Sequence, residues 1–157
     1  MSNKNNARCI GVLFSAFALA FSVQTAFAET STKKAADWGV VIDKKKVTNV
    51  AAFIPYTANG TKMELIAIRA SDGTIRTALN TCQVCYNSGR GFYKQEGDVF
   101  VCQNCGNRFK ADQIEKIKGG CNPVPILSSD KTDLGDTIGI SKSYLESVTP
   151  YFARWKK

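Results

Sequence analysis

Two Cys-x-x-Cys pairs constrain the fold of this chain more than any other feature of its sequence. Cys82 and Cys85 form the first pair, Cys102 and Cys105 form the second, and sixteen residues lie between them. Four thiolates paired in this way can enclose one metal ion or one iron–sulfur cluster, provided that the chain folds back and brings the pairs together. A further cysteine, Cys121, follows in a Gly-Gly-Cys-Asn-Pro run and is predicted to be a fifth ligand, a replacement ligand or a free thiol.

Residues 1–28 have the layout of a secretory signal peptide. Lys4 and Arg8 supply a basic start, residues 9–23 are uncharged and largely apolar, and Ala26-Phe27-Ala28 is a small-x-small cleavage site. The apolar run is shorter than the roughly 20 residues that a membrane-spanning helix needs. We therefore expect cleavage after Ala28 and a mature protein in the periplasm.

Cys9 leaves with the signal peptide, and three fates are open for the cysteines that remain after export. The four paired thiolates bind a metal or a cluster, or they form structural disulfides, which an oxidising compartment favours. A thioredoxin-like redox pair is the third alternative, although no βαβ pattern surrounds either Cys-x-x-Cys pair. Zn²⁺, a single iron ion and the common iron–sulfur clusters all accept four thiolates, so the ligand type alone does not choose among them.

Composition narrows the chemistry further. The chain contains no histidine, which excludes His-ligated zinc, copper and haem as well as His-dependent catalytic triads. The formal net charge is +8, but the lysines and arginines are spread along the sequence rather than interleaved with aromatics in one stripe. A nucleic-acid partner is not expected, whereas attraction to an acidic partner or peripheral contact with an anionic membrane is consistent with this charge.

Turn signals predict a β-rich antiparallel fold before the first cysteine pair. A short strand is predicted over residues 38–42, and Asn59-Gly60 between two apolar runs predicts a hairpin of residues 47–58 and 62–70. Within the second run, Leu65 and Ala67 are expected on one side and Ile66 and Ile68 on the other. A second turn at Ser71-Asp72-Gly73 leads into a strand over residues 74–80, which delivers the chain to Cys82.

A second hairpin is predicted between the two cysteine pairs, with residues 91–94 and 98–101 flanking Gln95-Glu96-Gly97. It supplies the reversal that lets the pairs meet. After it we predict the following elements: a short helix over 111–118 with Ile114 and Ile117 on one face, an extended strap over 121–126, a strand over 137–140, and a helix over 142–147 capped by Ser141.

The predicted fold class is therefore α+β: a β-rich antiparallel meander with a four-cysteine, ribbon-like hairpin and short helices. Its predicted organisation is a flexible N-terminal arm with a short strand (29–46), a Cys-rich domain (47–148) and a basic tail (149–157). Aromatic side chains near the pairs either wall the site from water or form an ordinary hairpin core, and basic side chains could offset the negative charge of the site. The aromatics are Tyr86, Phe92, Tyr93, Phe100 and Phe109, and the basic residues are Arg90, Lys94, Arg108 and Lys110.

The motifs in this region resemble those of the FtrD-like family, described as membrane iron–sulfur containing proteins. The resemblance rests on the runs Ala78–Tyr86, Gly91–Asp98 and Val101–Phe109 and on Gly119-Gly120-Cys121-Asn122-Pro123. It covers roughly residues 47–148 and is strongest over residues 82–125. It implies a metal centre held by Cys82, Cys85, Cys102 and Cys105, with or without Cys121.

The same resemblance implies a role in ferrous iron uptake alongside a membrane iron permease and periplasmic iron-binding or redox proteins. Many relatives carry transmembrane helices before this domain, so this chain would be a stand-alone periplasmic version. We interpret it as a metal- or iron–sulfur-binding electron-transfer component rather than a stand-alone catalyst. Iron or an iron–sulfur cluster is the expected cofactor. The alternatives are a structural zinc ribbon that serves as a docking module and a thiol–disulfide redox protein.

Overall fold

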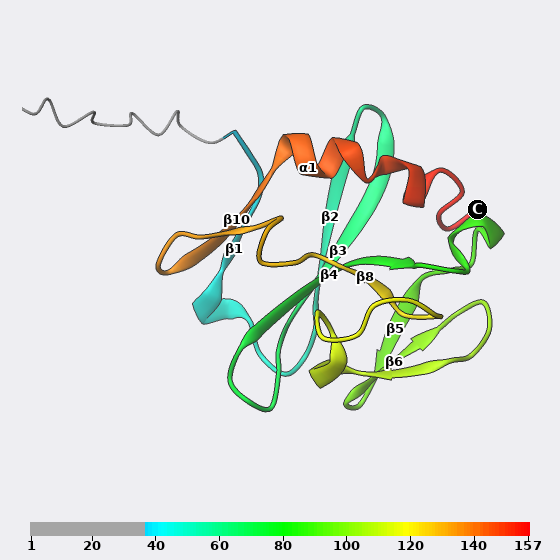
Figure 1. The fold of residues 1–157 in the computed structure, drawn as a ribbon, viewed down its shortest axis with the longest axis horizontal. Helices are drawn as coiled ribbons and strands as arrows, with labels where there is room; N and C mark the ends of the chain where they lie inside the picture. Colours follow the sequence, from blue (N-terminus) through cyan, green and yellow to red (C-terminus); the bar gives the residue numbers. More distant parts are fainter. Residues whose placement is uncertain (1–36) are drawn as a thin grey trace, which may run out of the picture. The chain divides into compact units, whose positions relative to one another are not determined.

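The structure is a computed structural model that describes residues 37–157. The predicted signal peptide with its cleavage site at Ala28, and the first part of the predicted arm, lie outside the described residues. The described chain forms three antiparallel sheets joined by short connections and short helices (Figure 1). Among these residues, no helix has the length and apolar character needed to cross a bilayer.

A four-stranded sheet forms the centre of the fold. Its strand order is β2 (Ala52–Ala58), β3 (Thr61–Arg69), β4 (Ile75–Cys82) and β8 (Pro123–Pro125). Asn59 and Gly60 connect β2 to β3 with φ values of 48° and 77°, the left-handed pair that a two-residue hairpin turn requires. The predicted hairpin and the meander that leads to Cys82 are therefore confirmed.

Strands β3 and β4 of the central sheet are largely buried on both faces. Leu65 and Ala67 lie in one hydrophobic cluster, while Ile66 and Ile68 lie in a second. This is the predicted alternation of β3, because successive side chains of a strand point to opposite faces. Cys82 and Cys102 belong to the second cluster, so the cysteine site lies on that face of the sheet.

A three-stranded sheet covers the first cluster. It contains β1 (Trp38–Asp43), β10 (Thr137–Ser141) and β9 (Thr132–Asp133), with β10 in the middle. The helix α1 (Lys142–Ser147) follows β10 and lies against β1, β10 and β2 (Figure 1). Ser141 caps this helix by accepting a hydrogen bond of 3.2 Å from the backbone N–H of Tyr144, as predicted.

The folded unit is wider than the predicted 47–148 domain. Val40 and Ile42 of β1 are buried in the first cluster, and so is Phe152 of the 3₁₀ helix η4 (Thr149–Phe152). The side chain of Trp155 also contacts this cluster. These apolar residues draw both flanking segments into the core, so the strand of the predicted arm and the predicted basic tail are structural parts of the domain.

The third sheet carries the second cysteine pair. It consists of β5 (Tyr93–Glu96), β6 (Val99–Cys102) and β7 (Arg108–Lys110), with β6 in the middle. The predicted hairpin between the cysteine pairs is confirmed, but its turn lies at Gly97 and Asp98 rather than at Gln95-Glu96-Gly97. Gly97 has a φ of 63°, which fixes the turn one position further along the chain.

The helix predicted over residues 111–118 is wrong. Only the 3₁₀ helix η3 (Ala111–Gln113) forms there, and Ile117 is exposed whereas Ile114 is buried. Glu115 adopts a left-handed φ of 67°, which ends any helix. Its carboxylate accepts hydrogen bonds from the backbone N–H and hydroxyl of Thr77 and pairs with Lys131, so distant contacts hold this conformation.

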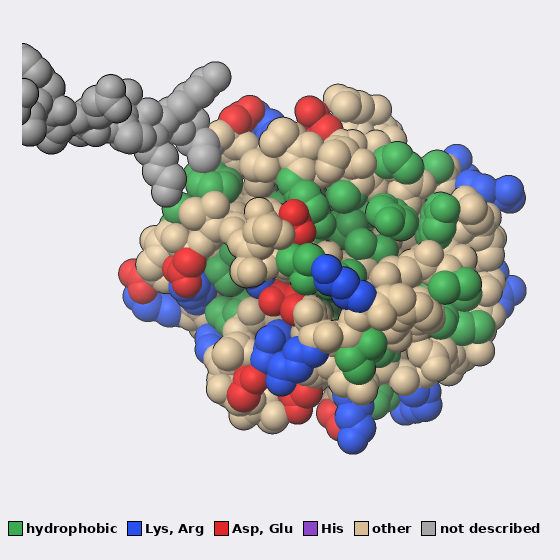
Figure 2. All heavy atoms as spheres, in the orientation of Figure 1, with side chains coloured by type: hydrophobic (Ala, Val, Ile, Leu, Met, Phe, Trp, Pro, Cys, Tyr) green, Lys and Arg blue, Asp and Glu red, His purple; other side chains and the backbone are tan. Residues whose placement is uncertain are grey.

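The strand-rich, antiparallel part of the predicted fold class is confirmed, while its helical part is small. Among residues 37–157 the structure has one six-residue α-helix and four 3₁₀ helices. The 3₁₀ helices are η3, η4, η1 (Lys44–Lys46) and η2 (Tyr86–Ser88). On the face that Figure 2 shows, lysine and arginine side chains are spread out and several lie beside acidic ones. Exposed ion pairs such as Lys142–Asp37, at 2.7 Å, are consistent with this distribution.

Candidate metal centre

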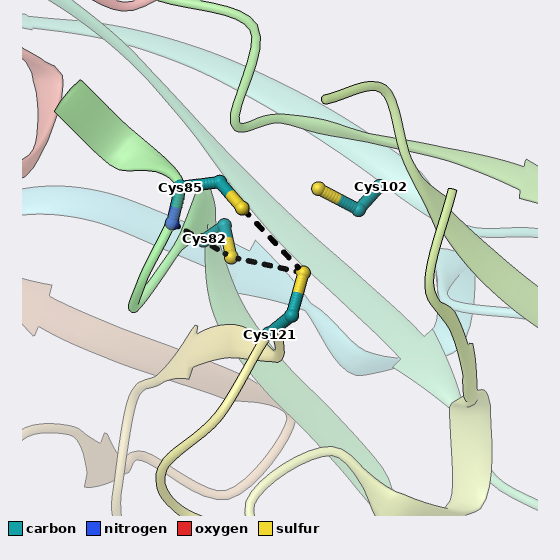
Figure 3. A group of neighbouring side chains, drawn as sticks. All are labelled: Cys82, Cys85, Cys102 and Cys121. Carbon is teal, nitrogen blue, oxygen red and sulfur yellow. Dashed lines mark hydrogen bonds between the residues drawn. The ribbon is translucent and has the colours of Figure 1, made fainter. Parts of the chain in front are cut away.

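Four sulfur atoms converge on the second face of the central sheet. The Sγ atoms of Cys82, Cys85, Cys102 and Cys121 all lie within 4.8 Å of one another, a group that could hold a metal ion (Figure 3). Cys82 and Cys102 are buried, and Cys85 and Cys121 are partly buried. The site lies between two sheets, because Cys82 ends β4 and Cys102 ends β6. The predicted ribbon is thus built from two sheets rather than one hairpin.

Two adjacent carbonyl groups hold the two cysteine pairs in place. The N–H of Cys82 donates to the Gly91 carbonyl at 2.7 Å, and the N–H of Gln103 donates to the Phe92 carbonyl at 2.8 Å. The next residue, Tyr93, pairs with Cys102 in the β5–β6 ladder. The segment before β5 therefore fixes the spacing of both pairs, which is the role that the sequence predicted for this hairpin.

The strap that carries Cys121 is tied to both pairs. Gln83, inside the first pair, donates its N–H to the Asn122 carbonyl at 3.0 Å and accepts the N–H of Gly119 on its side chain, also at 3.0 Å. On the other side, the Asn107 amide donates to the Cys121 carbonyl at 2.7 Å. Cys121 is thus held between the two turns by backbone contacts as well as by its sulfur.

Cys121 belongs to this group of four, beside the predicted ligands Cys82, Cys85 and Cys102. Its Sγ lies 3.4 Å from that of Cys82 and 3.8 Å from that of Cys85. Cys105 falls outside the group of four, is exposed, and contacts Cys121 with 2.8 Å between the two Sγ atoms. The structure therefore brings together the five cysteines of residues 37–157, with Cys121 among the inner four and Cys105 at the outer edge.

The two Cys-x-x-Cys turns differ in their backbone. In the first, the N–H of Cys85 points to the Cys82 Sγ at 3.3 Å, and the chain continues directly into η2. In the second, Gly106 adopts a left-handed φ of 74° and donates its N–H to the Cys102 carbonyl at 2.9 Å. A backbone N–H directed at a sulfur stabilises the thiolate, so the first turn favours the charged form of Cys82.

The five thiols differ in acidity. Burial acts most strongly on Cys82 and opposes ionisation, but hydrogen bonds from the Tyr93 hydroxyl and from backbone N–H groups outweigh it, so its pKa lies below the ordinary value. Contact with Cys121 and the N–H of Asn107 lower the pKa of Cys105 to about 7. Burial raises the pKa of Cys85 to about 11 and raises the pKa of Cys121 further. Metal binding must therefore displace protons, above all from Cys85 and Cys121.

Two distances within the group of four sulfurs fit a single tetrahedral ion. Metal–sulfur bonds of about 2.3 Å in a tetrahedron place neighbouring sulfurs about 3.8 Å apart. The distances of 3.4 Å and 3.8 Å from the Cys121 Sγ to those of Cys82 and Cys85 agree with this value. Ligands of a polynuclear cluster lie further apart because the inorganic core stands between them. These two distances favour one thiophilic ion.

The side chains expected around the site are present in different roles. Tyr93 directs its hydroxyl to the Cys121 Sγ at 3.8 Å, and Phe100 and Phe109 share the cysteine cluster. Tyr86 and Phe92 instead pack against the C-terminal residues Tyr151 and Trp155. Arg108 pairs with Glu96 and Arg90 donates to the Gln103 carbonyl, whereas Lys94 and Lys110 are exposed on the third sheet.

Sequence reasoning missed Asn80, which connects the two sheets at the site. Asn80 is buried, and its side chain accepts the N–H of Tyr93 at 2.8 Å and donates to the Tyr93 carbonyl at 3.2 Å. An available signal was a polar side chain two residues before the first cysteine in a strand otherwise expected to be buried. A buried amide must be hydrogen-bonded, so its presence indicates a specific partner.

Comparison with known proteins gives a family and two distantly similar solved structures. No curated protein matches the chain. Among solved structures, the quaternary ammonium Rieske monooxygenase CntA in complex with inhibitor MMV12 matches with a TM-score of 0.45 and 17% identity, covering 69% of this chain and 32% of that one. The same enzyme with its substrate L-carnitine matches with a TM-score of 0.44 and 17% identity over the same shares. The chain thus spans about a third of the length of these enzymes.

The family match covers most of the described chain. Residues 40–152 match the family described as membrane iron–sulfur containing protein FtrD-like. This span includes all five clustered cysteines, residues 40–43 of β1 and the helix η4. The chain belongs to the FtrD-like family of membrane iron–sulfur containing proteins.

Proposed function

We propose that this chain is an exported iron-binding protein that passes electrons in support of ferrous iron uptake. The observation that carries the proposal is the convergence of four sulfurs within 4.8 Å of one another. Membership of a family described by its iron–sulfur content supports iron as the metal. The absence of histidine from the sequence agrees with an all-sulfur ligand set.

The proposed ligands are Cys82, Cys85, Cys102 and Cys121, around a single iron ion. When bound, such an ion supplies a one-electron Fe(II)/Fe(III) couple. The protein's own groups bind and shield it. Cys82 and Cys102 are buried, the N–H of Cys85 faces the Cys82 sulfur, and the Tyr93 hydroxyl faces the Cys121 sulfur. Hydrogen bonds to the sulfurs favour the more negative charge of the reduced state.

Electrons would enter and leave at the outer edge of the site. Cys105 is exposed there, and Val84, in the turn of the first pair, is 62% exposed. The three segments that carry the sulfurs, 82–94, 101–110 and 116–125, contain basic residues and no carboxylates. Arg108 pairs with Glu96 and Lys116 with Asp72, so the basic groups proposed to attract an acidic partner and accelerate weak, transient docking are Arg90, Lys94, Lys110 and Lys118. The proposed partners are a membrane iron permease and its associated periplasmic redox or iron-binding proteins.

The proposed location is the periplasm. It rests on the layout of residues 1–28, with basic Lys4 and Arg8, an apolar run and the cleavage site at Ala28. Because the described residues contain no helix that could cross a bilayer, electron exchange with the membrane in this proposal depends on a membrane-bound partner.

Uptake of radiolabelled Fe(II) tests this role. Cells that lack the chain are complemented with the wild type, with Cys82→Ser, or with Lys62→Gln as a control on an exposed site away from the sulfurs. We expect the wild type and Lys62→Gln to restore uptake and Cys82→Ser to fail at equal protein abundance. Uptake that is unaffected by loss of the chain, or restored by Cys82→Ser, would contradict the proposed role.

A structural zinc site is the second candidate. The observation in its favour is the single-ion spacing of the sulfurs, which suits Zn²⁺ as well as iron. In that case the site would stabilise a docking surface and carry no electrons. A colourless protein with one zinc per chain and no redox response supports this candidate, and Cys102→Ser would then unfold the protein without loss of any redox signal.

A further inference from the structure

Cys105 and Cys121 are in direct contact, although neither belongs to the other's sequence motif. Their Sγ atoms lie 2.8 Å apart, closer than the 3.4 Å and 3.8 Å that separate the Cys121 Sγ from those of Cys82 and Cys85. Cys105 is exposed and Cys121 is partly buried. The Asn107 amide donates to the Cys121 carbonyl at 2.7 Å, so the backbones that carry the two sulfurs are held together.

Cys121 can therefore act either as a metal ligand or as a disulfide partner. As one of the inner four sulfurs it completes a ligand set, and as the neighbour of Cys105 it can form a covalent S–S bond. A sulfur in a disulfide has no thiolate to offer a metal, so the two uses of Cys121 exclude each other. Because Cys105 is exposed, a reagent from solution reaches the Cys105 sulfur before the Cys121 sulfur.

We propose that Cys105 and Cys121 form a site of reversible thiol–disulfide exchange, in which a disulfide between them withdraws Cys121 from the metal ligands. The reagent class is a molecule that carries an accessible disulfide, either a protein or a small thiol compound in its oxidised form. The exchange site stands on the contact between the two sulfurs, and its effect on the metal rests on the proposed metal centre.

The exchange proceeds in two displacements. The Cys105 sulfur attacks one sulfur of the incoming disulfide, its bond to that sulfur forms, and the other half leaves as a thiolate. The Cys121 sulfur then attacks the Cys105 sulfur and expels the second half. Two protein thiols are oxidised by two electrons in total, the incoming disulfide is reduced to two thiols, and the two protein protons go to the two leaving sulfurs.

Access makes this pair more reactive than the pairs within the motifs. Cys82 and Cys102 are buried with 0% and 1% of their surface exposed, so an incoming disulfide cannot reach them. Cys105 is exposed and has Cys121 as a resolving partner within contact distance. Redox-responsive cysteines commonly combine an accessible thiol with an adjacent resolving thiol. The structure thus favours a Cys105–Cys121 bond over a bond within either Cys-x-x-Cys pair.

Oxidised glutathione, added without oxygen to the full chain, tests the proposal. Peptide mapping of the alkylated protein is expected to find a Cys105–Cys121 crosslink, and iron per chain is expected to fall as the crosslink accumulates. Cys121→Ser should stop at a glutathione adduct on Cys105, because the resolving sulfur is missing. Cys105→Ser should keep whatever iron it holds when the same reagent is added.

Two results would overturn the proposal: a crosslink that maps to Cys82–Cys85 or Cys102–Cys105, or loss of iron from Cys105→Ser at the rate of the wild type. The readouts also separate the two proposals. A chain that holds no metal but still forms the Cys105–Cys121 crosslink supports the exchange site and contradicts the metal centre. A chain that holds iron and forms no crosslink contradicts the exchange site alone.

Discussion

The side chain of Asn80 binds both backbone polar groups of Tyr93 and so connects strand β4 to strand β5. It accepts the N–H of Tyr93 at 2.8 Å and donates to its carbonyl at 3.2 Å. Asn80 lies two residues before Cys82, and Tyr93 pairs with Cys102 across the β5–β6 ladder. This buried amide therefore supports the position of both cysteine pairs, together with the Gly91 and Phe92 carbonyls.

Replacing Asn80 with leucine is expected to weaken both the fold and the metal site. The change leaves the N–H and carbonyl of Tyr93 buried without these partners, which costs about 2–4 kcal/mol of unfolding free energy. Metal affinity is expected to fall by about 10–100-fold, as when a group that orients a ligand is lost. Urea unfolding and competition with a chelator measure the two effects, with exposed Asn87→Ala as the control. Equal behaviour of the two variants would contradict this role.

Gly91 is expected to tolerate no side chain. A Cβ at this position would overlap the carbonyl of Cys85 and lie 2.8 Å from the Tyr86 nitrogen, both of them backbone groups. Gly91→Ala should therefore displace the first cysteine turn and lower the amount of metal bound per chain. Gly97→Ala is the matched control, because its φ of 63° also strains alanine but its Cβ would meet open space. Normal metal content in Gly91→Ala would show that the turn does not need this close approach.

Phe152 tests whether the C-terminal residues are structural. It is 3% exposed and lies in the first hydrophobic cluster, although the sequence placed it in a basic tail. Phe152→Ala is expected to reduce the free energy of unfolding by about 3–5 kcal/mol. The neighbouring, exposed Arg154→Ala should change it little. A chain ending at residue 148 that unfolds at the same urea concentration as the full chain would contradict this assignment.

Asp72 is expected to contribute to the loss of stability in acid. Hydrogen bonds from the side chain and N–H of Thr74, then the Arg76 guanidinium, hold the pKa of this exposed carboxylate well below its usual range. A folded-state pKa below the unfolded value of about 3.9 gives stabilisation that is present above that pH and lost as the pH falls further. The stability difference between the wild type and Asp72→Asn should therefore shrink below about pH 4. A stability difference between the two proteins that stays constant from neutral to acidic pH would contradict this role of Asp72.

Local signals in the sequence predict much of this fold, and distant contacts account for what they miss. Asn59-Gly60 and Ser141 act through their own turn and helix end, so the β2–β3 hairpin and α1 were predictable. Glu115 adopts its left-handed conformation because of contacts with Thr77 and Lys131, which are far away in the sequence. The spacing of apolar residues over 111–118 does not reveal these contacts, so the helix predicted there was wrong.

Contacts between distant segments also decide what the sequence could not predict about the cysteine site. Spacing identifies Cys82, Cys85 and Cys102 because the Cys-x-x-Cys motif is local, and the intervening hairpin explains their approach. The choice between Cys105 and Cys121 depends on the strap, which pairs with β4 through β8 and is held by Gln83. That pairing joins segments about forty residues apart, beyond the reach of any motif.

The most direct test of the account is metal analysis of the protein isolated without oxygen from its own compartment. We predict one iron per chain with a thiolate-to-iron absorption that dithionite bleaches and mild oxidation restores. Cys121→Ser should lose this iron and its absorption, whereas Cys105→Ser should retain both. A colourless chain that holds zinc, a chain with several irons and inorganic sulfide, or iron that depends on Cys105 and not on Cys121, would contradict the proposed single iron ion bound by Cys82, Cys85, Cys102 and Cys121.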